Sequence, residues 1–196
     1  MPKPYTPNDK WSQKAAAEGY RARSVYKLME LDDRFDLLKA GMIVLDLGAA
    51  PGSWLQYTSK QIGPKGKVIG LDLTKIEPVG ENVELIEQDI TDLNAIDRIL
   101  AERSLTQVDL ILSDMAPNTS GVKDNDQWKS IELNRAAVAI AQKFLRPSGA
   151  CVLKVFRGAD FDEFLRELKS AFKDVRIVTV EASRDRSREV YVVLRK

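Results

Sequence analysis

The sequence contains no histidine and only one cysteine, Cys151, among its 196 residues. The absence of histidine excludes Ser-His-Asp triads, imidazole metal ligands and histidine acid–base catalysis. Any proton transfer must therefore use lysine, aspartate, glutamate or tyrosine. A single cysteine excludes an internal disulfide and a cysteine-based zinc site. Because Cys151 lies in the apolar run ACVLKVF, we expect a buried, unreactive thiol there.

Long apolar runs are also missing, since none approaches the ~20 residues that a membrane span requires. The first residues, MPKPYTPNDKWSQ, lack a secretory apolar core and are too acidic and arginine-poor for a transit peptide. We therefore expect a cytoplasmic protein. A chain of 196 residues with 44% hydrophobic content fills one domain and hardly two. We expect a single domain over 1–196, with residues 1–17 as a flexible, proline-containing arm and 18–40 as a helical extension.

Apolar runs alternate regularly with helical stretches beyond residue 42. The predicted strands are 43–47, 67–73, 83–90, 108–115, 150–156, 175–180 and 189–195. The predicted helices that follow most of them are 54–62, 92–104, 127–145 and 160–172. Asp160, with Glu163 three residues later, predicts a capping box at the start of the last helix.

Strands that alternate with helices predict an α/β fold, with a mostly parallel seven-stranded sheet and helices on both faces. The last two strands have no helix between them. We expect them to pair as an antiparallel hairpin, which gives the sheet an antiparallel edge strand.

The stretch DLGAAPGSW lies where the first predicted strand turns into a helix. Gly48 and Gly52 permit positive φ angles and close approach of a ligand, and Pro51 stiffens the turn. The first turn of the following helix offers free N–H groups and a positive dipole end, which suit a carboxylate or a phosphate.

Acidic residues lie at the carboxyl ends of three further predicted strands. Asp72 comes twenty positions after Gly52, where an acid can accept hydrogen bonds from ribose hydroxyls. Asp89 is placed to meet an adenine edge, and Asp114 ends the fourth strand. Three acids would repel a pyrophosphate but suit the sulfonium of S-adenosylmethionine (SAM). Spacing alone leaves a nicotinamide enzyme open, although the G-x-G-x-x-G signature is absent.

The segment SDMAPN places no aromatic residue after Pro117, which disfavours an exocyclic nitrogen as the methyl acceptor. Lys154 is a second unusual feature, because it interrupts the apolar run CVLKVF. It could form a structural ion pair with Asp114, or it could act as a general base. A lysine serves as a base near neutral pH when another cation lies close, such as Lys27 or a sulfonium. The residues alone leave both interpretations open.

Basic residues concentrate in two segments of a chain whose net charge is only +1. Residues 1–27 carry six of them, including Arg21 and Arg23. A second group, called here the arginine cluster, consists of Arg184, Arg186 and Arg188. Such segments suit a polyanion, although charge alone fits a solvated surface equally well.

Five segments together resemble the FtsJ/RrmJ family of SAM-dependent ribose 2'-O-methyltransferases. They are GYRARSVYKL, VLDLGAAPGSW, SDMAPNTSG, LKVFRG and SRDRSREVYVV, in the family's order from about residue 18 to the end. The resemblance implies a Rossmann-like methyltransferase fold. Ser53 departs from the bacterial ribosomal enzyme, which has a further glycine there.

The resemblance also implies the site residues. The family's catalytic Lys-Asp-Lys-Glu tetrad falls on Lys27, Asp114, Lys154 and Glu189, and its SAM contacts fall on Gly52, Trp54, Asp72, Asp89 and Asp114. Lys154 would take or relay the proton, Asp114 would orient it, Lys27 would hold ribose or phosphate, and Glu189 would position the lysines. No metal is required.

The implied activity is methyl transfer from SAM to a ribose 2'-hydroxyl, with a uridine of large-subunit rRNA as the expected target. Lys27 and Glu189 each adjoin a basic segment, so both segments would flank the site, and we expect Arg21, Arg23 and the arginine cluster to bind RNA. Two alternatives stay open: a tRNA anticodon-loop methyltransferase, and a low-turnover RNA-binding or ribosome-assembly module. We expect a monomer.

Overall fold

A β-sheet of seven strands forms the centre of the structure, a computed structural model that describes residues 9–117, 121, 123–183 and 188–196. The strands are β1 (Ile43–Leu47), β2 (Lys67–Asp72), β3 (Val83–Glu87), β4 (Val108–Ser113), β5 (Leu145–Phe156), β6 (Asp174–Val178) and β7 (Glu189–Arg195). The helices are α1 (Lys10–Ala17), α2 (Val25–Phe35), α3 (Ser53–Ile62), α4 (Leu93–Glu102), α5 (Lys123–Phe144) and α6 (Phe161–Ala171).

The strand order is β3-β2-β1-β4-β5-β7-β6. The first five of these strands pair in parallel, whereas β7 is antiparallel to both β5 and β6. The predicted antiparallel pairing of the last two strands is therefore confirmed, with β7 lying between β5 and the outermost strand β6. Central strands such as β1 are buried along almost their whole length, because helices cover both faces of the sheet.

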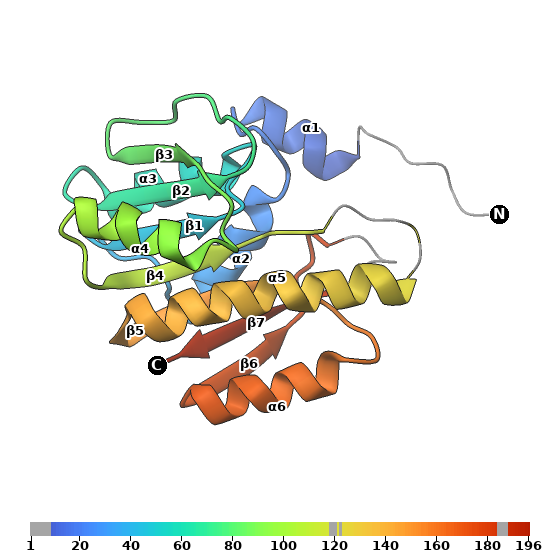
Figure 1. Cartoon of the computed structure of the whole chain (residues 1–196). Helices are drawn as coiled ribbons and strands as arrows, with labels where there is room; N and C mark the ends of the chain where they lie inside the picture. The colour runs from blue at the N-terminus through green and yellow to red at the C-terminus, as the bar shows by residue number, and fades with distance from the viewer. Residues whose placement is uncertain (1–8, 118–120, 122, 184–187) are drawn as a thin grey trace.

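Two apolar layers enclose the sheet (Figure 1). Side chains of α4, α5 and α6 pack on one face, and those of α1, α2 and α3 pack on the other. Within the described part of the chain, no helix combines the length and the apolarity that a bilayer crossing requires.

The order of the strands reverses between β1 and β4. The chain runs outward from β1 through β2 to β3 and then returns to β4 on the other side of β1. In sheets of this type, ligands bind beyond the carboxyl ends of the strands at such a reversal. The end of β1 leads into the glycine turn and the end of β4 leads into Asp114, so the fold brings these two predicted features together.

The segment predicted as an arm contains a helix in its second half. Asp9 caps α1, because its carboxylate accepts a hydrogen bond from the Ser12 N–H at 2.9 Å. Ala15 is buried, and the ring of Trp11 lies 5.1 Å from that of Tyr26 on α2. A cap and an aromatic contact with α2 thus hold residues 10–17 in place, whereas residues 1–8 lie outside the described residues.

The predicted capping box at α6 does not form. Asp160 occupies the N-cap position, but its side chain makes no capping hydrogen bond. Its backbone is already helical, with φ −88° and ψ 0°, whereas a capping side chain requires an extended backbone to reach back to the first turn.

Candidate active site

The glycine turn after β1 forms one wall of a small hollow at the reversal point. Gly48 and Gly52 adopt φ angles of 72° and 103°, in the left-handed region that favours glycine. A Cβ atom at Gly48 would lie 2.1 Å from Cγ of Met115, so the approach of this loop to the end of β4 also requires glycine. The residues that line the hollow are Ser24, Asp46, Gly48, Ala49, Ala50, Ser53, Trp54 and Asp114.

Lys154 and Asp114 form an ion pair beside this hollow. Lys154 is only 7% exposed, and its Nζ lies 3.1 Å from Oδ1 of Asp114 and also donates to the Asp114 main-chain carbonyl. The two residues meet because β4 and β5 are neighbours and both side chains point to the face covered by α2 and α3. A buried lysine is thus paired with an acid from the adjacent strand.

Lys27 and Glu189 form a second buried ion pair, between α2 and the start of β7. The hydroxyl of Ser183 donates to the same Glu189 carboxylate at 2.7 Å. Burial on its own would raise the pKa of Glu189, but the charge and hydrogen bond of Lys27, helped by Ser183 and Lys154, lower it overall. Glu189 is therefore ionised at neutral pH.

Tyr191 connects the two ion pairs. It faces Lys154 across the β5–β7 ladder, and its hydroxyl donates to Oδ1 of Asp114 at 2.6 Å. Its ring lies 5.7 Å from Nζ of Lys27. Burial, followed by the charges of Asp114 and Glu189, raises the pKa of Tyr191 well above its usual value, so the phenol keeps its proton. The sequence analysis missed this residue, although it carries the only side-chain hydroxyl group of its strand.

The main chain around Lys154 is held by polar side chains of α5. Asn134 donates to the carbonyl of Lys154 at 2.8 Å, and the Phe156 N–H donates to the hydroxyl of Ser130 at 3.2 Å. These two helical residues are buried, and they lie four positions apart and therefore on one face of α5. They fix the end of β5 that carries the lysine.

The predicted cofactor residues surround the same edge of the sheet. Asp72 accepts hydrogen bonds from the N–H groups of Ala50 at 2.9 Å and Thr74 at 2.8 Å, which ties it to the glycine turn. Asp89 lies two residues beyond the end of β3 and accepts from the N–H and hydroxyl of Thr91. Trp54 is buried, and its indole N–H donates to the Ser24 carbonyl at 2.8 Å.

Asp46 is a second residue that the sequence analysis did not assign. It is 1% exposed, and its Oδ2 has no hydrogen-bond partner among the described residues. Burial, followed by the charges of Asp114 and Asp72, raises the pKa of Asp46 well above its usual value. A signal was present in the sequence, since Asp46 is an acid inside an otherwise apolar strand.

The arginines predicted to bind RNA have different surroundings. Arg21 donates to main-chain carbonyls of the glycine turn and of the loop between β2 and β3, and Arg23 pairs with Asp9. Arg188 is exposed. The other members of the arginine cluster, Arg184 and Arg186, lie outside the described residues.

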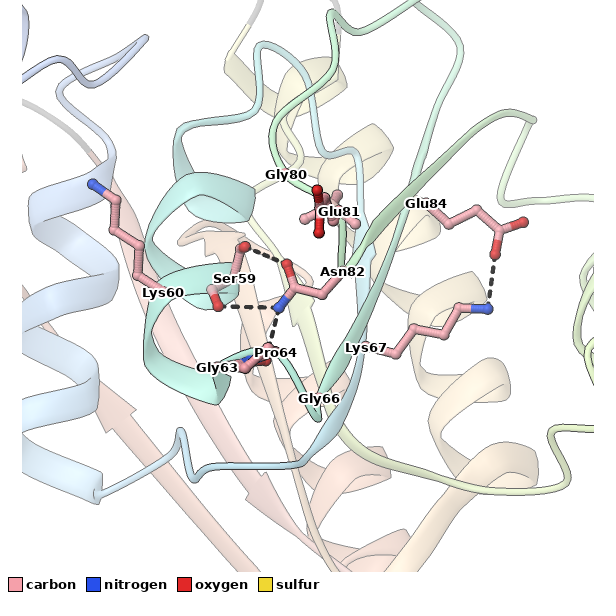
Figure 2. Close-up of a pocket in the computed structure, with 11 residues that line it drawn as sticks. Ser59, Lys60, Gly63, Pro64, Gly66, Lys67, Gly80, Glu81, Asn82 and Glu84 are labelled. Atoms are coloured by element: carbon pink, nitrogen blue, oxygen red, sulfur yellow. Dashed lines mark hydrogen bonds and ion pairs between the residues drawn. The ribbon is translucent and has the colours of Figure 1, made fainter.

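A larger hollow lies at the opposite end of the sheet, at the start of β2 and β3 (Figure 2). Figure 2 shows Asn82 bridging Ser59 and Gly63 at the end of α3, and Lys67 paired with Glu84. These contacts occupy several of the polar groups in view, and none of the predicted site residues lines this hollow.

The reversal point, the glycine turn and the buried lysine–acid pairs define an enzyme of the Rossmann-like methyltransferase class. A family model described as FtsJ-like methyltransferase matches residues 20–196. The chain belongs to this family, and the resemblance stated from its motifs is confirmed.

Named relatives support the same assignment. A Cellvibrio japonicus protein named ribosomal RNA large subunit methyltransferase E is 45% identical over 186 residues, which cover 95% of this chain and 88% of the relative. A Bdellovibrio bacteriovorus protein of the same name is 41% identical over 96% of both chains. A Plasmodium falciparum crystal structure, assigned as a ribosomal RNA methyltransferase, is 32% identical with a TM-score of 0.78 and covers 90% of this chain and 98% of its own. The predicted fold class is confirmed.

Proposed function

We propose that the chain is a SAM-dependent RNA 2'-O-methyltransferase whose target is a uridine of large-subunit rRNA. The observation that carries the proposal is the pair of buried lysine–acid ion pairs at the reversal point. The match to methyltransferases named for large-subunit rRNA supports this substrate.

The residues at the glycine turn fit SAM as the cofactor. Gly52 and the N-terminus of α3 suit its carboxylate, and Asp72 suits its ribose. Asp46 lines the hollow, and its Oδ2, which has no hydrogen-bond partner among the described residues, could be satisfied by a polar group of the cofactor. Asp89 and Trp54 complete the expected set of contacts. When bound, SAM supplies an electrophilic methyl group on a sulfonium sulfur.

Lys154 takes or relays the proton that the ribose 2'-hydroxyl loses as its oxygen gains the methyl group. Asp114 orients the lysine through the 3.1 Å contact, and Tyr191 fixes Asp114 from the other side. Alignment of the attacking oxygen with the methyl group supplies much of the acceleration in such displacements. The packing of β5 against α5 keeps the lysine in place for this step.

Lys27 holds the ribose or a neighbouring phosphate, and Glu189 positions Lys27. Both side chains are largely buried. The target nucleotide must therefore enter the site before Lys27 can contact it. The helical segment 18–40 and Arg188, which adjoins Glu189, then flank the entrance, and RNA binds to this segment and to the arginine cluster. The enzyme acts as a monomer in the cytoplasm, where ribosomal RNA is found.

The test is incubation with radiolabelled SAM and, separately, large ribosomal subunits, free rRNA and tRNA, followed by mapping of the labelled nucleotide. The proposal predicts label on a ribose of large-subunit rRNA. An RNA with a single 2'-deoxy substitution at that nucleotide should bind but accept no methyl group. Label on tRNA would show that the substrate is tRNA and not rRNA, and label on a base would show that the enzyme does not methylate the ribose. Binding of RNA without any label would indicate an RNA-binding module.

A further inference from the structure

Arg21 joins two loops that lie on either side of the predicted cofactor site. Its Nη1 donates to the carbonyls of Pro51 at 3.1 Å and Glu77 at 2.8 Å, and its Nη2 donates to the carbonyl of Pro78 at 2.7 Å. Pro51 belongs to the glycine turn, whereas Glu77 and Pro78 belong to the loop between β2 and β3. One guanidinium thus fixes the distance between the two loops.

These two loops flank Asp72. The Ala50 N–H of the glycine turn donates to Oδ2 of Asp72, and the chain continues from Asp72 into the second loop. The guanidinium also packs directly against the turn, since a Cβ atom at Gly52 would lie 2.7 Å from Nη1 of Arg21. A change in the position of Arg21 would therefore shift Asp72 and Gly52 as well.

The main chain of Arg21 is also held by hydrogen bonds. Its N–H donates to Oε1 of Gln56 at 2.9 Å, and Nε2 of the same glutamine donates to the Gly19 carbonyl at 3.0 Å. Gln56 lies in the first turns of α3, directly after the glycine turn. Both ends of the arginine are thus attached to the cofactor side of the protein.

We propose that Arg21 is a positioning residue for the cofactor rather than a phosphate contact for RNA. Its three acceptors are main-chain carbonyls that only a planar, forked donor can reach together. This assignment differs from the RNA-binding role expected from its place in a basic segment, and it rests on the proposed function because it takes SAM as the ligand.

The test compares Arg21→Lys and Arg21→Gln with the parent protein. Lysine keeps the charge but cannot span both loops, so both variants should bind SAM about 10- to 100-fold more weakly in calorimetry. The KM for SAM should rise in parallel, whereas kcat at saturating SAM should stay within about twofold. Arg21→Lys should keep the parent RNA affinity and its dependence on salt.

Arg34 offers a matched control, because its guanidinium also donates to a main-chain carbonyl, that of Thr179, at 3.0 Å. Arg34→Lys and Arg34→Gln should leave SAM affinity unchanged. The proposal is overturned if Arg21→Lys binds SAM as the parent does while Arg21→Gln weakens RNA binding and its salt dependence. If the parent protein itself fails to bind SAM, the proposed function is wrong, and the proposed role of Arg21 is then wrong as well. Thermal unfolding of each variant separates loss of the fold from loss of the site.

Discussion

Replacement of Asp46 by asparagine should stabilise the cofactor-free protein, and increasingly so as the pH rises. Asp46 is 1% exposed, its Oδ2 has no partner among the described residues, and burial raises the pKa of its carboxyl group well above the usual value. Asparagine has nearly the same shape and carries no charge. The substitution therefore removes the cost of burying an acid and changes little else.

The sign and size follow from proton linkage. The pKa of Asp46 is raised in the folded state, so the stability it contributes is fully present below the unfolded pKa of about 3.9 and is lost as pH rises toward the folded value. Where the unfolded carboxyl is ionised and the folded one protonated, this loss approaches about 1.4 kcal/mol per pH unit. Between pH 5 and 7 the variant should gain up to about 2.7 kcal/mol over the parent.

Urea unfolding at pH 5, 6 and 7, without cofactor, measures this difference directly. Asp109→Asn serves as the control, because the Asp109 carboxylate accepts from the Ile43 N–H at 2.7 Å and pairs with Arg146. That variant should lose stability, since the Ile43 N–H and Arg146 both lose a charged acceptor. A stability difference between Asp46→Asn and the parent that does not change with pH would refute the reasoning.

Three further predictions test the site and the RNA surface. Asp72→Ala and Asp89→Ala should each weaken SAM binding by roughly 5- to 150-fold in calorimetry, as expected for a lost hydrogen-bond partner, and unchanged affinity in both would contradict the pocket. Replacement of the arginine cluster by alanine should reduce the slope of log RNA affinity against log salt concentration by roughly 0.7–0.9 per lost phosphate contact. An unaltered slope would show that these arginines are solvated surface residues that do not contact RNA. Tyr191→Phe should lower kcat by about tenfold or more at saturating substrates, because Asp114 loses its 2.6 Å donor, and an unchanged kcat would remove Tyr191 from the mechanism.

Much of the sheet could be predicted because strand periodicity and burial agree along it. The predicted ranges 43–47 and 189–195 coincide with β1 and β7. The start of β5 could not be predicted, since it begins at Leu145 and runs through Pro147 with a shift in register against β4. Proline there argues against a strand on local grounds, and only the pairing of Leu145 with Val108 shows otherwise.

The same distinction applies to the site. Lys154 is conspicuous in the sequence because it is a charge inside an apolar strand, and Asp114 because it ends a predicted strand, but their roles are implied only by the family resemblance. Tyr191 is an ordinary strand residue until the ladder places it opposite Lys154. The carbonyls that bind Arg21 lie 30 to 57 positions away, and no local pattern encodes a hydrogen bond to the main chain over such distances.

The most direct test of the account is single-turnover methylation of large-subunit rRNA by Lys154→Ala, with SAM and RNA both saturating. Loss of a general base should lower the rate roughly 10²- to 10⁴-fold, while the affinities for SAM and RNA change far less. Lys143→Ala, which removes an exposed lysine paired with Asp97, should react at the parent rate. If Lys154→Ala also methylates at the parent rate, the buried lysine is structural and the proposed mechanism is wrong.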